Sequence, residues 1–176
     1  YDAVYNRQHP PGFRWLHESF GTNWRMTEIQ AAIGRIQLKR MSDWTAKRQR
    51  NALEIDKALS GFECIRLVNV PDDCEHAEYK HYAFIKSEKL NDGWTRDRIV
   101  EEINALGVPC FQGSCSEVYL EKAFDNTGWR PKQSLPNAKK LGEMSVMFLV
   151  HPTLTEDEVN KTCLVIEQVL KIASDY

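Results

Sequence analysis

One stretch near the N-terminus decides the fold of this chain: Gly21-Thr22-Asn23-Trp24-Arg25-Met26-Thr27-Glu28-Ile29-Gln30-Ala31-Ala32-Ile33-Gly34. Thr27 followed by Gln30 fits a capping box, so a helix is expected to begin there. Downstream, large apolar side chains recur at helical spacing and give this helix one apolar face: Met26, Ile29, Ile33 and Ile36. The stretch therefore predicts a polar loop that leads into a long amphipathic helix.

Two strong hydrogen-bond donors stand in the loop ahead of that helix. Asn23 offers an uncharged amide, and Arg25 offers a planar fork of N–H groups that suits a carboxylate or a phosphate. The ordinary alternative is that both side chains are simply solvated, because capped amphipathic helices are common. For Arg25, an ion pair with Glu28 is a further alternative.

The run from Gly21 to Leu38 resembles the hallmark of the DegT/DnrJ/EryC1/StrS family of sugar aminotransferases, roughly G-x-N-x-R-M-x-E-x-Q-A-A-x-G-x-x-Q-L. The resemblance continues at lower density nearly to the C-terminus. It implies the small C-terminal domain of a fold-type-I pyridoxal-phosphate enzyme. Residues 1–25 would then be the tail of the large cofactor domain and the interdomain loop, and residues 26–176 the small domain with its long connecting helix.

The order of the other elements predicts an α+β fold, in which helices pack on a mixed or antiparallel sheet and a long helix comes first. That helix should bend near Ser42-Asp43 and end before Gly61, as a C′ residue. Capping residues should open two later helices, at Thr95 and at the box Thr155–Glu158, and Gly107 should stop the first of them. Strands are expected within 62–70, 79–85, 108–111 and 146–150, and further helices at 118–124 and 136–144.

The resemblance also implies which functional residues lie in this chain and which lie upstream of it. In the family, the Schiff-base lysine and the aspartate that pairs with the cofactor ring lie upstream, in the larger domain. No residue of this chain is therefore expected to be catalytic, and the chain alone is expected to be inactive. Lys39, Lys47 and Lys80 are expected to be solvated. The resemblance implies that Asn23 reaches the pyridoxal-phosphate phosphate of the other subunit in a homodimer, with Arg25 near the cofactor or the substrate.

One polar loop departs from the family pattern. Gly113, Ser114 and Cys115 stand where members carry His, Tyr and a small residue, and Tyr119 stands where they carry a second His. Ser114 and Tyr119 are predicted to hydrogen-bond a sugar hydroxyl or phosphate. The structural alternative is that Ser114 only makes a turn and that Tyr119 packs in the core.

The bulk composition excludes other classes of partner. The 176 residues carry a formal net charge of -2, so no global field favours nucleic acid or an anionic membrane. The odd, scattered set of cysteines argues against a disulfide framework and for a reducing cytoplasm: Cys64, Cys74, Cys110, Cys115 and Cys163. A zinc site on Cys110, Cys115 and a distant His, or a Cys nucleophile paired with His81 or His151, has no support from spacing, and no metal is expected.

The resemblance implies a pyridoxal-phosphate-dependent aminotransferase that aminates a nucleotide-linked keto sugar, with glutamate as the amino donor by family habit, in polysaccharide or other amino-sugar biosynthesis. Two alternatives stay open: a non-catalytic α+β binding or dimerisation module, and a dehydratase of the same family. The aminotransferase hypothesis predicts that the aromatic segment before Gly21 lies at an interface. The module hypothesis predicts that this segment packs on the chain's own helices.

Overall fold

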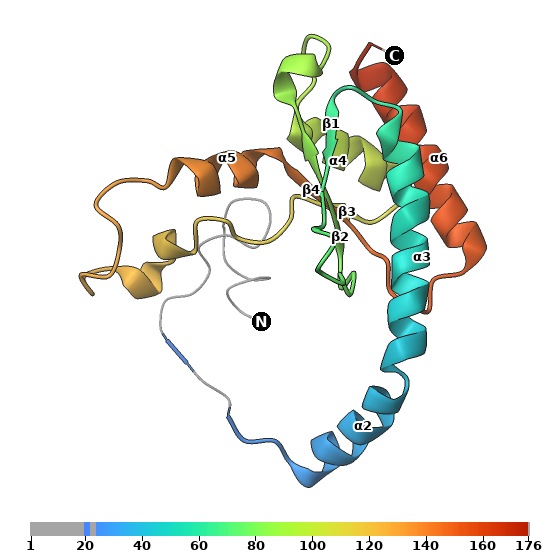
Figure 1. Ribbon diagram of the computed structural model, residues 1–176. Helices are drawn as coiled ribbons and strands as arrows, with labels where there is room; N and C mark the ends of the chain where they lie inside the picture. The colour runs from blue at the N-terminus through green and yellow to red at the C-terminus, as the bar shows by residue number, and fades with distance from the viewer. Residues whose placement is uncertain (1–19, 22–23, 176) are drawn as a thin grey trace.

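The computed structural model describes residues 20–21 and 24–175 (Figure 1). Within them the chain forms five α-helices and four strands. The helices are α2 (Glu28–Lys39), α3 (Met41–Ser60), α4 (Arg96–Ala105), α5 (Pro136–Met144) and α6 (Glu156–Ala173). The strands are β1 (Ile65–Leu67), β2 (His81–Ile85), β3 (Cys110–Phe111) and β4 (Ser145–Phe148). The α+β class predicted from the sequence is confirmed.

The four strands form one antiparallel sheet in the order β1-β2-β4-β3. In the central pair, Tyr82 lies opposite Met147 and Ala83 opposite Val146. Along β2, His81, Ala83 and Ile85 are buried, whereas Tyr82 and Phe84 are half-buried. This alternation means that the two sets of side chains point to opposite faces of the sheet.

The core lies between one face of the sheet and helices α3, α4 and α6 (Figure 1). Each helix contributes branched aliphatic side chains to it: Ile55 and Leu59 from α3, Ile99 and Ile103 from α4, and Ile166 and Leu170 from α6. The sheet adds Ala83, Ile85, Val146 and Phe148. The inward set of β2 therefore belongs to the core, and Tyr82 belongs to the other face.

The three helix starts that capping residues predict are confirmed. Thr27 and Gln30 form a reciprocal capping box at α2, and Thr155 and Glu158 form one at α6. Thr95 caps α4 by accepting from the Arg98 N–H. The first N–H groups of a helix have no acceptor within the helix and bond to such side chains, which is why short polar motifs predict these starts well.

Three boundaries differ from the prediction. The first helix breaks at Arg40, which ends α2 and begins α3, rather than at 42–43. Gly61 caps α3 in a right-handed conformation (φ -74°) and is not a left-handed C′ residue, because the Phe62 N–H bonds back to Leu59 and the chain turns without a positive φ. Residues 118–124 form two 3-10 turns, η2 (Val118–Leu120) and η3 (Lys122–Phe124), instead of one helix.

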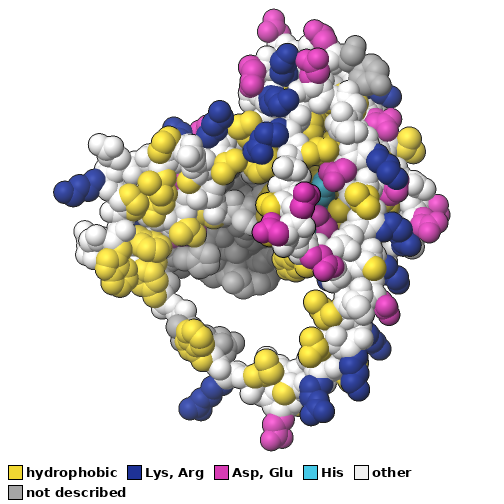
Figure 2. Space-filling view, in the orientation of Figure 1, with side chains coloured by type: hydrophobic (Ala, Val, Ile, Leu, Met, Phe, Trp, Pro, Cys, Tyr) yellow, Lys and Arg dark blue, Asp and Glu magenta, His cyan; other side chains and the backbone are white. Residues whose placement is uncertain are grey.

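Helix α2 projects away from the core and buries none of its residues (Figures 1 and 2). Its predicted apolar face is therefore exposed, with more than half of the surface of Ile29, Ile33 and Ile36 accessible. Just before the helix, Trp24 is 88% exposed. Contiguous exposed apolar side chains of this size mark interaction surfaces. No helix in residues 20–21 and 24–175 is long and apolar enough to cross a bilayer.

The position of the core predicts the effect of two matched substitutions on α6. Ile166 is 0% exposed and Leu164 is 67% exposed. We expect Ile166→Ala to lower the free energy of unfolding by about 2–5 kcal/mol, because it removes buried methyl groups and leaves a cavity. Leu164→Ala should change it by no more than about 0.5 kcal/mol. Denaturant unfolding followed by circular dichroism measures both; equal losses would contradict the assigned core.

The two capping boxes predict a difference in pH dependence. Hydrogen bonds from the backbone and side chain of Thr155 lower the pKa of Glu158 below its ordinary 4.5. Its stabilisation of α6 is therefore complete above that ordinary value and is lost as pH falls through the lowered pKa. The box at α2 uses the uncharged Gln30, so it should not respond to pH in this range.

Thr155→Ala should raise the Glu158 pKa toward 4.5, as read from its carboxyl chemical shift in an NMR titration. It should also cost about 1 kcal/mol of stability. Thr27→Ala is the control, because it removes the equivalent cap without a titrating partner. Because the Thr155 backbone N–H also bonds to Glu158 and is kept in this variant, a Glu158 titration that Thr155→Ala leaves unmoved would show that the Thr155 hydroxyl does not contribute to the lowered pKa.

Candidate functional site

The loop 112–116, which follows β3, is held against the sheet by its first residue. The backbone oxygen of Gln112 accepts from Ser145 Oγ at 2.7 Å. Its side-chain Nε2 donates to Asp97 Oδ1 at 2.9 Å. Gln112 is thus fixed from β4 on one side and from the first turn of α4 on the other.

Two glycines let this loop approach its neighbours closely. Gly113 has φ +94°, and a Cβ there would lie 2.9 Å from Ser145 Oγ and 3.1 Å from Tyr82 Cε1. On α5, a Cβ at Gly142 would collide with Ser116. Small residues therefore stand where a bulkier loop would not fit, which gives a physical reason for the departure from the family pattern at this loop.

Ser114 is exposed, and its Oγ lies 3.0 Å from Oη of the half-buried Tyr82. Either oxygen can donate to the other. The two hydroxyls carry one O–H donor each, and their mutual hydrogen bond uses one of these donors. One donor and several lone pairs therefore stay available to a ligand. Ser114 is accordingly placed where a ligand oxygen could reach it, and its role in substrate binding stays a prediction.

Tyr119 is placed differently, because its side chain is 91% buried and its hydroxyl is used internally. The hydroxyl donates to Glu117 Oε1 at 2.6 Å and accepts from the Leu135 N–H at 2.9 Å. Its only proton is therefore committed within the chain. This matches the structural alternative for Tyr119. The residue also borders an open cavity of about 390 Å³ that Arg130, Lys132 and Lys139 line as well.

A buried arginine supports the whole loop and was not foreseen from the sequence. The guanidinium of Arg96 donates from Nη1 to the carbonyls of Gly142 (2.9 Å) and Ser145 (2.6 Å). Its Nε donates to Asp97 Oδ1 at 2.6 Å, the same oxygen that holds Gln112. A residue just after an N-cap is usually solvated, so no local pattern marks Arg96; only the packing of α4 against α5 and β4 does.

The predicted cofactor residues lie elsewhere. Asn23 falls outside the described residues. Arg25 is exposed, forms no ion pair with Glu28, and borders a shallow cavity with Trp24, Met26 and Gln30. In Figure 1 this segment, ahead of α2, is well separated from the loop 112–116. The structure therefore does not bring Arg25 and Ser114 into one site within a single chain.

These residues fit one end of pyridoxal phosphate but not the other. Among the described residues no carboxylate pairs with the exposed guanidinium of Arg25, and such a fork of N–H donors suits the cofactor phosphate. The aldehyde end needs a desolvated lysine, and no lysine is buried in the part of the chain that the structure describes. Lys39 and Lys47 are exposed, as predicted, and Lys80 is half-buried with its ammonium 5.7 Å from the centre of the Tyr79 ring.

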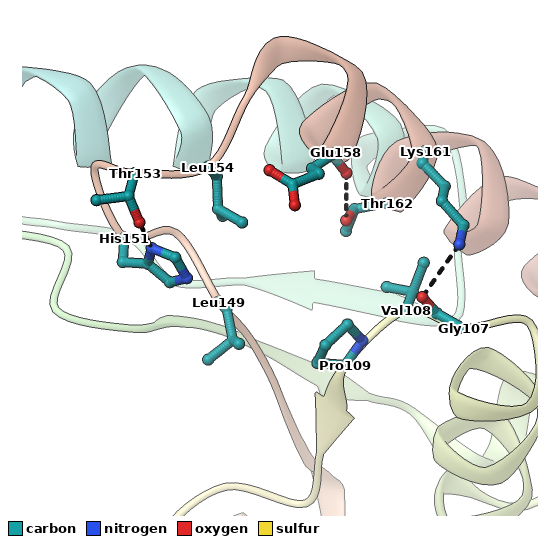
Figure 3. Close-up of a pocket in the computed structure, with 10 residues that line it drawn as sticks. All are labelled: Gly107, Val108, Pro109, Leu149, His151, Thr153, Leu154, Glu158, Lys161 and Thr162. Carbon is teal, nitrogen blue, oxygen red and sulfur yellow. Dashed lines mark hydrogen bonds between the residues drawn. The ribbon is translucent and has the colours of Figure 1, made fainter.

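A larger cavity of about 420 Å³ lies away from this loop, between the start of β3 and the N-terminus of α6 (Figure 3). Its polar side chains already have internal partners. Lys161 Nζ donates to the Gly107 carbonyl at 3.2 Å, and Thr153 Oγ1 lies 2.8 Å from His151 Nδ1. Because β3 runs from this cavity toward Gln112, the cavity and the loop 112–116 mark opposite ends of that strand.

The cysteine alternatives find no matching geometry. Burial raises the pKa of Cys110 to about 12, so its thiolate is disfavoured. His81 contacts Asp56 and Glu78, and His151 contacts Thr153. Among residues 20–21 and 24–175, no three His, Cys, Asp or Glu side chains are grouped so that they could hold a metal ion.

Comparison with known proteins identifies the family. The model of the DegT/DnrJ/EryC1/StrS aminotransferase family matches residues 6–168. The chain belongs to this family. The resemblance seen in the hallmark run from Gly21 to Leu38 is thereby confirmed, and family members are pyridoxal-phosphate-dependent sugar aminotransferases.

Three proteins illustrate how similar this chain is to others in sequence or structure. The crystal structure of an aminotransferase from Psychrobacter cryohalolentis is 58% identical, with a TM-score of 0.80 over 97% of this chain and 45% of that protein. The GDP-perosamine synthase of Caulobacter vibrioides is 29% identical over 91% of this chain and 42% of its own length. The dTDP-3-amino-3,4,6-trideoxy-alpha-D-glucose transaminase of Streptomyces venezuelae is 28% identical over 80% and 35%, respectively. The chain spans less than half of each of these proteins.

Gly113 lies so close to Ser145 and Tyr82 that a side chain there should be sterically destabilising, and Gly128 provides a control position for this effect. Gly113→Ala should lower the free energy of unfolding by about 1–3 kcal/mol more than Gly128→Ala does. Gly128 also has a positive φ (+76°), but a Cβ there would meet nothing within 4 Å. Both substitutions share the conformational cost, so the difference in denaturant unfolding isolates the contact with Ser145 and Tyr82. Equal costs would show that the loop is not tightly seated.

Proposed function

We propose that this chain is the small C-terminal domain of a homodimeric pyridoxal-phosphate-dependent aminotransferase. The whole enzyme would transfer an amino group from an amino acid, with glutamate as donor, to a nucleotide-linked keto sugar. Residues 1–25 would complete the large cofactor domain and the interdomain loop, and residues 26–176 would form the small domain. The product would serve cytoplasmic synthesis of polysaccharides or other amino-sugar compounds.

The observation that carries this proposal is the family match over residues 6–168, which includes the hallmark run. The substrate class is supported by relatives whose names describe nucleotide-linked amino sugars, such as the transaminase of Streptomyces venezuelae and the GDP-perosamine synthase of Caulobacter vibrioides. When bound, pyridoxal phosphate would act as the electron sink for the transfer of nitrogen. This chain would contribute phosphate binding through Asn23 and Arg25, and sugar binding through Ser114 and, less directly, Tyr119.

The exposed face of α2 supports the homodimer. A helix that buries none of its residues gains little from its own packing, and its aliphatic side chains favour association. Arg25 and Trp24 stand directly ahead of this face. A second subunit covering α2 would therefore lie beside the proposed phosphate-binding residues.

One contact favours the non-catalytic module. The Phe20 ring packs on Phe124 at 5.2 Å and on Trp129 at 5.7 Å between ring centroids. Residue 20 is thus held by its own chain, as that hypothesis predicts for the segment before Gly21. A contact at the border of an interface is also compatible with the enzyme, so activity has to decide.

The deciding assay uses the longer protein that contains this chain. It is incubated with ¹⁵N-glutamate and a nucleotide-linked 4-keto or 3-keto sugar, and the product is analysed by mass spectrometry. Incorporation of ¹⁵N into the sugar is expected. Loss of the elements of water without nitrogen transfer would instead identify the dehydratase, and an unchanged sugar with no spectral change of added cofactor would favour the module.

The proposed phosphate contacts predict a loss of cofactor affinity. Asn23→Ala or Arg25→Ala in the longer protein should each raise the apparent Kd for pyridoxal phosphate about 10- to 100-fold, the cost of one hydrogen bond to a charged group. Arg35→Ala, a neighbouring cation on the exposed surface of α2, is the matched control and should leave this Kd unchanged. If Arg25→Ala and Arg35→Ala raise this Kd equally, Arg25 acts only through its positive charge and not through a specific hydrogen bond to the phosphate.

A further inference from the structure

Tyr82 lies on the strand at the centre of the sheet but faces away from the core. Its neighbours His81 and Ala83 point inward, whereas its own ring shares the other face with Met147, its partner in the register. A tyrosine that served only packing would not need its hydroxyl near a polar loop. Here the phenol oxygen reaches Ser114, 32 residues later in the chain.

The position of this phenol is fixed before any ligand arrives. The β2–β4 pairing sets the backbone of Tyr82. Gly113 lies against the Tyr82 ring, and Gln112 is bound by both Ser145 and Asp97. The loop cannot shift without breaking these contacts. Binding of a ligand to these two hydroxyls would therefore cost little conformational entropy, because both side chains are already ordered.

We propose that Tyr82 is a substrate-binding residue and that the Tyr82–Ser114 hydroxyl pair binds an uncharged oxygen of the sugar. This inference rests on the proposed function. After one O–H is used within the pair, one donor and free lone pairs remain, so the pair both donates to and accepts from a ligand. A sugar hydroxyl or carbonyl oxygen matches this combination. A phosphate would favour a cation, and the nearby guanidinium of Arg96 is committed to two carbonyls and Asp97.

The pair also fits the replacement of larger side chains in the loop. With Gly113 and Ser114 at the tip, the loop lies close to β2, and Ser114 itself is too short to span a gap. The longer side chain of Tyr82, on the strand, extends to where the short Ser114 side chain alone could not contact a ligand. Specificity for the sugar would then depend on a residue of the sheet as well as on the loop.

The test uses the whole enzyme and measures its two half-reactions separately. Tyr82→Phe, Ser114→Ala and the double variant are compared with two controls, Tyr79→Phe and Ser87→Ala. Tyr79 is 77% exposed, and Ser87 is exposed at the start of the 3-10 turn Ser87–Lys89. Each variant is first checked for an unchanged Tm.

For the half-reaction that consumes the sugar, Tyr82→Phe and Ser114→Ala should each lower kcat/KM about 3- to 10-fold, mainly through KM, as expected for one neutral hydrogen bond. The double variant should lose less than the product of the two single losses, because the two groups act as a unit. The half-reaction with the amino donor, followed by the cofactor spectrum, should stay unchanged. The controls should alter neither half-reaction.

The outcomes separate this inference from the proposed function. If the wild-type enzyme transfers no nitrogen, the proposed function fails. If it transfers nitrogen and Tyr82→Phe leaves the sugar half-reaction unchanged, or weakens both half-reactions and the Tm together, the role assigned to Tyr82 is wrong.

Discussion

The buried guanidinium of Arg96 is the interaction on which the candidate site depends. It ties the end of α5 to the start of β4 by donating to the carbonyls of Gly142 and Ser145. A buried charge is costly unless it is paired and hydrogen-bonded, and here Asp97 pairs with the guanidinium by accepting from its Nε. The position of Ser145 then fixes Gln112, and Gln112 fixes the loop that carries Ser114. A site made of neutral hydroxyls is thus positioned by one ionic network behind it.

Much of the fold could be predicted from the sequence because its signals are local. A capping motif only four residues long sets the start of a helix. The alternating burial along β2 likewise follows from one face of the strand being covered. The break at Arg40 was placed two residues late, since no Gly or Pro marks it. Gly61 ends α3 without the left-handed turn that its identity favours, because the Phe62 N–H bonds back to Leu59 in a right-handed turn.

The candidate site was less predictable because its contacts are non-local. Position relative to a family pattern selected Tyr119, whose proton is committed to Glu117. Tyr82 falls within the strand predicted for residues 79–85, but its contact with Ser114 depends on the pairing of β2 with β4 and on the path of the loop 112–116. A one-residue shift of that register would turn the phenol into the core. Sequence patterns at short range do not carry this information.

The separation of the two groups of ligand-binding candidates constrains how they could act. Arg25 stands before α2, which projects away from the core, whereas Ser114 lies on the loop 112–116 and contacts Tyr82 of the sheet. No movement of side chains joins them within one chain. In a two-fold symmetric dimer each interface is used twice, so an arm that is too far from its own sheet can serve the partner's site. In such a dimer the exposed aliphatic face of α2 would be covered by the second subunit, because none of the residues of α2 is buried within its own chain.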